Sequence, residues 1–117
     1  MEVKKYVPIV KRGEICKVFL ESIMLIEQDL RKTRIYTEDD TYWIYRKIDE
    51  LVKYLDQNFL KCHQSCIINL DKVIKMKDQT IYFENGYKIS MGREKFHFAK
   101  QHFARHITQI NEESPLL

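Results

Sequence analysis

The sequence predicts a compact, mostly antiparallel β fold with two short helices, in a single domain of 117 residues. Many short segments are rich in β-branched and aromatic residues, which suit the half-buried surface of a strand. Turn-forming residues separate these segments, and the clearest is the pair Asn85-Gly86 between two apolar segments. Helical spacing of apolar residues occurs in only two places.

Composition and charge limit the classes of protein to which the chain can belong. Hydrophobic residues make up 44% and aromatic residues 12% of the chain, which argues against disorder. No apolar run has the length of a membrane span, and the first residues lack the apolar core of a signal peptide. The odd count of 3 cysteines fits a reducing compartment. We therefore expect a cytoplasmic protein with no membrane partner. The net charge of +3 permits a nucleic-acid partner without establishing one.

The chain begins with three expected strands. Residues 7–11, 15–20 and 23–28 are rich in Ile, Val and Leu, and short polar segments separate them. Residues 33–37 and 41–46 then alternate polar and apolar side chains on either side of a short acidic turn. We expect this last pair to form a hairpin.

The apolar period changes from two to between three and four after this hairpin. Asp49 and Glu50 suit a helix start through the helix dipole, so we expect a short helix over residues 48–55. Its apolar face would be formed by Ile48, Leu51, Val52 and Leu55.

The second half is expected to contain further strands and a longer helix. Residues 59–62 and 73–77 are extended in this interpretation, and residues 80–83 and 87–91 form a hairpin around the Asn-Gly turn. The last helix is predicted by a stripe formed by Phe96, Ala99, Lys100, Phe103 and Ile107. The predicted organisation is a lead-in at residues 1–7, a domain at 8–107 and a frayed tail at 108–117.

One segment carries the most specific signal. Residues 59–70 read Phe-Leu-Lys-Cys-His-Gln-Ser-Cys-Ile-Ile-Asn-Leu. This segment resembles the signature of the LytTR family, which is Phe-x-Arg-x-His-Arg/Lys-Ser-Tyr/Phe followed by two aliphatic residues and Asn. The spacing is intact, but Lys61 replaces Arg, Gln64 replaces a basic residue and Cys66 replaces an aromatic residue. The matching positions are Phe59, His63, Ser65, Ile67, Ile68 and Asn69.

The resemblance covers about residues 8–106 and implies a fold and a function. LytTR domains are mostly the DNA-binding output domains of bacterial response regulators in two-component systems. Their fold is an elongated stack of small antiparallel sheets with a short helix packed among them. The implied function is sequence-specific binding of duplex DNA in transcription regulation. In this family, loops and not a recognition helix are inserted in successive major grooves.

The resemblance places the first DNA-contacting loop between the third and fourth strands, at the densest basic cluster of the chain. Arg31, Lys32 and Arg34 suit phosphate groups, and Thr33 or an arginine suits a base edge. Charges in such a turn are also commonly only solvated, so the residues alone leave both interpretations open.

The second implied loop lies within the signature. Lys61, His63 and Ser65 are suited to phosphates or base edges, and Gln64 has the amide that pairs bidentately with adenine. The usual Arg or Lys at position 64 would favour guanine or phosphate, so this change bears on sequence preference. By residue type alone, a structural histidine and a solvated glutamine remain alternatives.

The third implied loop precedes the last helix. The family usually has Ser-Arg here. Gly92 replaces the serine and removes a hydroxyl contact, whereas Arg93 is preserved and suits guanine. Lys95 would add a phosphate contact. The alternative is a charge at a helix start, although the helix dipole mildly disfavours a cation there.

Other polar residues have structural interpretations. Asn69 lies in an aliphatic run, where an amide usually ties a turn to the backbone. Cys62, His63 and Cys66 lack the usual spacing of zinc ligands and a second ligand pair. We expect the two cysteines to be core or half-buried thiols, and we expect no metal and no cofactor. The sequence contains no catalytic motif, so we expect no enzyme activity.

The expected partners are double-stranded DNA and a receiver domain or another regulatory protein. No receiver domain fits before the first strand, so we interpret the chain as a fragment of a response regulator or as a stand-alone regulator. A dimer on DNA is a further expectation. The rival class is a protein-interaction module of the same fold that has lost DNA binding, which Gln64 and Gly92 keep open. Single-strand binding through Tyr82, Phe83 and Tyr87 is a weaker alternative.

Overall fold

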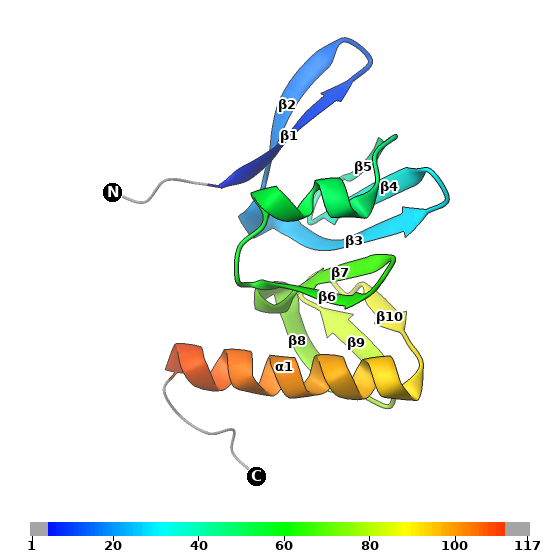
Figure 1. Cartoon of the computed structure of the whole chain (residues 1–117). Coiled ribbons are helices and arrows are strands. Elements are labelled where there is room, and N and C mark those ends of the chain that lie inside the picture. Colours follow the sequence, from blue (N-terminus) through cyan, green and yellow to red (C-terminus); the bar gives the residue numbers. More distant parts are fainter. Residues whose placement is uncertain (1–4, 112–117) are drawn as a thin grey trace.

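A computed structural model describes the main chain of residues 5–111 and the side chains of residues 5–108. Short strands and turns precede one long C-terminal helix in this part of the chain (Figure 1). The strands are β1 (Tyr6–Lys11), β2 (Glu14–Phe19), β3 (Ile23–Asp29), β4 (Lys32–Thr37), β5 (Thr41–Ile44), β6 (Phe59–His63), β7 (Cys66–Asn69), β8 (Val73–Lys77), β9 (Thr80–Phe83) and β10 (Lys88–Ser90). The 3-10 turns are η1 (Leu20–Ser22), η2 (Ile48–Glu50), η3 (Val52–Tyr54) and η4 (Leu70–Lys72), and the helix is α1 (Arg93–Asn111).

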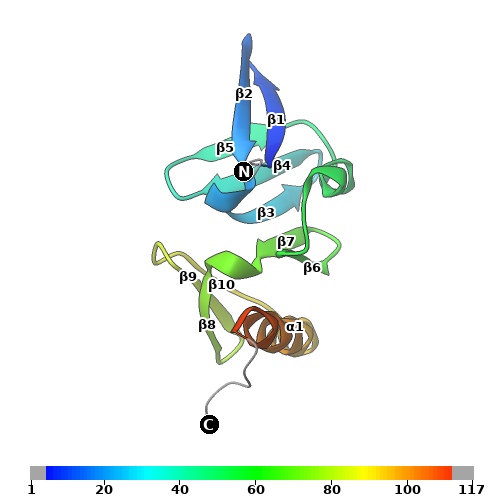
Figure 2. The same ribbon diagram turned by 90° about the vertical axis from the view of Figure 1, so that its left-hand side faces the viewer.

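The strands form three antiparallel sheets (Figures 1 and 2). The central sheet has the order β5-β4-β3-β7-β6, the hairpin β1-β2 lies beyond one of its faces, and the sheet β10-β9-β8 lies beyond the other together with α1. The described part is elongated, with extents of 51 × 38 × 24 Å. The predicted fold class, an elongated stack of small antiparallel sheets, is therefore confirmed.

Two buried clusters hold the stack together, one on each face of the central sheet. β3 contributes to both, because Ile23 and Ile26 belong to one cluster while Met24 and Leu25 belong to the other. A register shift between Ile23 and Leu25 allows two successive side chains to enter the same cluster. The first cluster joins the hairpin and η2 to the sheet, and includes Val7, Ile9, Val18, Ile35, Ile48, Leu51 and Ile67. The second joins β8, β9 and α1 to the sheet, and includes Cys62, Cys66, Ile68, Ile81, Phe83, Phe96 and Ala99.

The short helix expected over residues 48–55 is two consecutive 3-10 turns, η2 and η3. A 3-10 helix repeats every three residues, so Ile48 and Leu51 both face the core. Val52, which the expected α-helical face included, is 46% exposed. The carboxylate of Glu50 accepts a hydrogen bond of 3.0 Å from the main-chain N–H of the residue before η2, which stabilises the start of the turn.

The first strand and the last helix extend into the segments expected as the lead-in and the tail. β1 begins at Tyr6, within the expected lead-in of residues 1–7. α1 continues to Asn111, so the first residues of the expected tail at 108–117 are helical. Residues 112–117 of that tail lie outside the described residues.

The helix α1 covers the second cluster with three residues of the predicted stripe, whereas Lys100, which the stripe included, is exposed. Phe96 and Ala99 are buried, and Phe103 packs beside them. Nε2 of His106 lies 2.7 Å from Oδ1 of Asp71, which joins the helix to η4. No helix of the described residues has both the length and the apolar character that crossing a membrane requires.

Asn69 joins β7 to the start of β3. Its Nδ2 donates to the carbonyls of Leu20 at 3.3 Å and Ile23 at 2.8 Å, and its Oδ1 accepts from the N–H of Asp71 at 3.0 Å. The residue is only 3% exposed. The structural role predicted for this amide is therefore confirmed.

Candidate nucleic-acid interface

Three connections between elements lie along one side of the stack, at the right of Figure 1: the β3–β4 turn, the β6–β7 turn and the segment from β10 to α1. A main-chain hydrogen bond of 2.9 Å, from the N–H of Gln28 to the carbonyl of Ser65, joins the first two. The third connection lies near the second, because α1 contacts β6. We refer to the surface formed by residues 30–32, 63–65 and 92–95 as the turn edge.

The β3–β4 turn presents two cations. Asp29 and Lys32 pair across the hairpin, so Leu30 and Arg31 alone form the turn. Arg31 and Lys32 are exposed, and neither forms an ion pair with another described side chain. Nζ of Lys32 lies 5.3 Å from the ring centroids of Trp43, on β5, and Tyr45, just after it. These two exposed rings hold the lysine stem against the sheet.

Thr33 lies in the core, and not on the DNA-facing surface that its place in the basic cluster suggested. It is fully buried, and its hydroxyl donates to the carbonyl of Arg46. β5 ends at Ile44, two residues earlier than expected, so Arg46, whose carbonyl accepts this bond, lies after the strand. Successive side chains of a strand point to opposite faces. In β4, the side chain of Thr33 therefore points to the face opposite to those of Lys32 and Arg34.

Arg34 lies on the same face of the central sheet as Tyr36. Its guanidinium carbon lies 4.6 Å from the ring centroid of Trp43 and 5.4 Å from that of Tyr36. Its Nε is buried and has no hydrogen-bond partner among the described residues. The side chain therefore stabilises β4 against β5 through cation–π contacts, and it is less available to DNA than Arg31 and Lys32.

The β6–β7 turn contains His63, Gln64 and Ser65. Nδ1 of His63 accepts a hydrogen bond of 3.1 Å from the main-chain N–H of Ser65. Burial, followed by the charge of Lys95, lowers the pKa of His63, and Glu27 acts in the opposite direction. His63 is therefore a neutral imidazole at neutral pH, with its Nε2–H as donor. Gln64 is exposed at the turn.

Lys61 lies beside this turn but is paired with an acid. Its Nζ lies 2.5 Å from Oδ1 of Asp49 in η2, and both side chains are partly exposed. The carboxylate offsets the lysine charge in this arrangement. The sequence contained no sign of this pairing, because the two residues lie 12 positions apart, in η2 and β6.

The segment from β10 to α1 adds two more cations. Arg93 is the first residue of α1, and Lys95 follows in its first turn. Both are exposed and neither is ion-paired with a described side chain. The carbonyl of Gly92 accepts from the N–H of Phe96 at 2.9 Å, which begins the helix directly at the turn edge. A cation at this helix end gains nothing from the dipole, so its position is not explained by helix stability.

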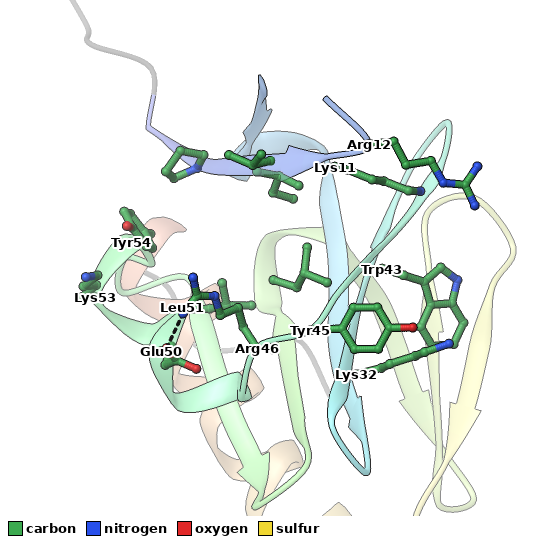
Figure 3. Close-up of a pocket in the computed structure, with 14 residues that line it drawn as sticks. Lys11, Arg12, Lys32, Trp43, Tyr45, Arg46, Glu50, Leu51, Lys53 and Tyr54 are labelled. Atoms are coloured by element: carbon green, nitrogen blue, oxygen red, sulfur yellow. Dashed lines mark hydrogen bonds and ion pairs between the residues drawn. The ribbon is translucent and has the colours of Figure 1, made fainter. Parts of the chain in front are cut away.

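A groove of about 770 Å³ lies between the β1–β2 hairpin and the segment from β5 to η3 (Figure 3). Its only acidic side chain, among the described residues, is Glu50, which pairs with Arg46 at 3.4 Å. Lys32 belongs both to this groove and to the turn edge. The other basic and aromatic residues that line the groove are Lys11, Arg12, Lys53, Trp43, Tyr45 and Tyr54.

The cysteines of the signature are core residues. Cys62 and Cys66 are buried in the second cluster. A hydrogen bond with Cys62, burial and nearby charge raise the pKa of the Cys66 thiol. No group of three or more His, Cys, Asp or Glu side chains is placed to hold a metal ion in the described part of the chain.

Two residues of the site have no counterpart in the sequence analysis. Gln28 supplies the main-chain bond to Ser65, and its side-chain Oε1 also accepts from the N–H of Ile48 at 2.7 Å. Leu30 is the most exposed large hydrophobic residue among the described residues, at 88%. Its signal in the sequence was an apolar residue between charged neighbours at the junction of two strands.

Comparisons with known proteins agree with the fold. The family model of the LytTr DNA-binding domain matches residues 13–104. A solved structure, the LytTr DNA-binding domain of a putative methyl-accepting/DNA response regulator from Bacillus cereus, has a TM-score of 0.69 at 19% sequence identity. That match covers 86% of this chain and 97% of the other. No curated protein matches the sequence significantly. The chain belongs to the LytTR family of DNA-binding domains.

Proposed function

We propose that the chain binds duplex DNA sequence-specifically in transcription regulation, by inserting the connections of the turn edge into successive major grooves. One observation carries the proposal. Exposed cations without carboxylate partners lie in two of the three connections on one side of the fold, at Arg31, Lys32, Arg93 and Lys95. A surface of this kind attracts the phosphate backbone, whose contacts position the protein.

The side chains of the turn edge divide into two roles. Arg93 and Gln64 have forked groups that match guanine and adenine edges, respectively, in the major groove. Lys32 and Lys95 are point charges on flexible stems, better suited to phosphate. Neutral His63 and the hydroxyl of Ser65 would assist by hydrogen bonding, while Thr33 supports the sheet from inside.

The remaining parts of the proposal concern the setting of the domain. We propose that it acts in the cytoplasm, that a receiver domain or a regulatory protein controls it, and that it binds DNA as a dimer. The family is one of DNA-binding domains, and we propose that the chain acts by binding DNA and not as an enzyme.

Salt dependence of DNA binding tests the proposal directly. A duplex selected from random sequences would be titrated by fluorescence anisotropy at several salt concentrations. With about four phosphates neutralised, the slope of log K against log salt should be about −3 to −4. The Lys100→Ala variant is a matched control, because Lys100 is an exposed lysine in α1 outside the turn edge. Absence of binding to every duplex at low salt would reject the proposal.

The groove favours a second candidate function, a protein-interaction module of the same fold. Its basic and aromatic lining suits an acidic segment of a partner protein. Under this alternative, Arg12→Ala and Lys53→Ala would weaken partner binding while Arg93→Ala would not. Retained DNA binding in both groove variants, with loss in Arg93→Ala, supports the DNA interface instead.

A further inference from the structure

Leu30 is an apolar side chain in a place where the fold gains nothing from it. It is 88% exposed at the tip of the two-residue β3–β4 turn. Its φ of 58° lies in the left-handed region, which a residue with a Cβ adopts at a cost and which favours glycine or asparagine. Neither burial nor backbone preference therefore explains a leucine at this position.

The surroundings of Leu30 restrict what it can contact. Asp29 precedes it, while Arg31 and Lys32 follow it, so a single apolar side chain stands among charged residues. A protein interface usually buries several hundred Å² on each partner around an apolar centre, and the one leucine of a two-residue turn does not by itself supply such a centre. A contact with one small apolar group fits its size.

The charges beside Leu30 indicate where that apolar group is found. Arg31 and Lys32 carry no ion pair with described residues and suit the phosphates on either side of a groove. Between those phosphates, the apolar group that the major groove presents is the C5-methyl of thymine.

We infer that Leu30 is a specificity-determining residue that contacts the C5-methyl group of a thymine in the bound DNA. The inference rests on the proposed function and adds a position of readout that uses no hydrogen bond. It assigns to the β3–β4 turn an apolar readout in addition to the phosphate contacts of its cations.

Replacement of thymine by deoxyuridine tests the contact, because it removes the methyl group and leaves base pairing intact. Each thymine of a selected duplex would be replaced in turn and titrated against the wild-type protein. At one position the affinity should fall by about fourfold, which corresponds to about 0.8 kcal/mol for one buried methyl-sized group. Leu30→Ala and Leu30→Gly should bind the thymine duplex more weakly and should not distinguish thymine from deoxyuridine there.

Two controls separate this contact from other effects. The Leu30→Gly variant suits the left-handed φ, so its native unfolding midpoint shows that the turn still folds. Ile74→Ala removes an exposed side chain, 60% accessible on β8, and should keep the full response to deoxyuridine. If the protein binds a selected duplex but no thymine responds, or if Leu30→Ala responds as strongly as the wild type, the inference is wrong and the proposed function stands. If no duplex binds at all, the proposed function fails and this inference fails with it.

Discussion

The main-chain N–H of Ser65 donates a hydrogen bond of 3.1 Å to Nδ1 of His63. This bond requires that Nδ1 carries no proton, so it couples the shape of the β6–β7 turn to the charge of the imidazole. Burial of the ring and the charge of Lys95 lower the pKa of His63, with Glu27 partly opposing them. The turn is therefore arranged around a neutral histidine.

Stability should depend on pH through His63. The unfolded chain titrates near the ordinary value of 6.5 and the folded chain below it, so the unfolded state binds more protons between these two values. The contribution to the free energy of unfolding is fully present above pH 6.5 and is lost as the pH falls through the folded-state pKa. Urea unfolding of the wild type and of His63→Gln between pH 8 and pH 5 measures it, and the variant should show a smaller decrease. In NMR titrations, the His63 ring and the Ser65 amide should share one midpoint. Independent midpoints would contradict the coupling.

Substitutions in the turn edge should separate base readout from phosphate contact. Arg93→Ala and Gln64→Ala should each cost about 1–3 kcal/mol on the preferred site and little on random DNA, because a bidentate base contact is lost. Lys32→Ala should weaken both complexes alike and flatten the salt slope by about one unit. Paired titrations against a selected and a scrambled duplex decide between these outcomes. Equal losses on both duplexes for Arg93→Ala would make Arg93 a backbone contact.

Lys61 should contribute less to DNA affinity than Lys32, because Asp49 already pairs with it. We expect a smaller loss of affinity for Lys61→Ala than for Lys32→Ala in the same low-salt titration. Asp49→Asn removes the competing carboxylate and should raise DNA affinity and steepen the salt slope. Unchanged binding in Asp49→Asn would show that Lys61 lies away from the DNA.

Thr33→Val should lower stability without changing sequence preference. Valine has nearly the shape of threonine but leaves the carbonyl of Arg46 without its hydroxyl partner. The expected loss in the free energy of unfolding is about 1–2 kcal/mol, measured by urea denaturation. The order of preferred duplexes in a competition assay should stay the same. A change in that order would return Thr33 to the DNA-reading set.

Asn69→Ala should lower the free energy of unfolding more than any substitution in the turn edge. It removes the partner of the Leu20 and Ile23 carbonyls and of the Asp71 N–H in a buried site. A group left unsatisfied in this way costs about 1–3 kcal/mol. Because the Leu20 carbonyl keeps the N–H of Ile23 as a partner, a loss of about 2–4 kcal/mol in the free energy of unfolding is expected. Asn69→Asp keeps the acceptor for Asp71 but not the two donated bonds, and it should not restore stability. A loss below about 1 kcal/mol for Asn69→Ala would contradict this account.

The local pattern of the sequence was sufficient for most elements. Alternation and turn residues predicted the strands because side chains on a strand repeat every two residues and Asn-Gly suits a hairpin turn. The local pattern did not decide the form of the helix at Ile48 and Leu51, because a segment of one to two turns fits both the α-helical and the 3-10 period. In the folded chain the segment is 3-10, with Ile48 and Leu51 packed in the first cluster beside the hairpin and Val52 exposed.

The candidate site also has features that the sequence determined and features that only the tertiary structure decided. The sequence alone determined the family signature at residues 59–70, the basic character of the β3–β4 turn and the structural role of Asn69. Only the tertiary structure decided that Thr33 is buried, that Arg34 packs on Trp43 and that Asp49 pairs with Lys61. These outcomes depend on which distant elements meet, and a residue type at a given spacing does not encode that. It also decided that Leu30, an ordinary aliphatic residue in the sequence, stands almost fully exposed on the turn edge.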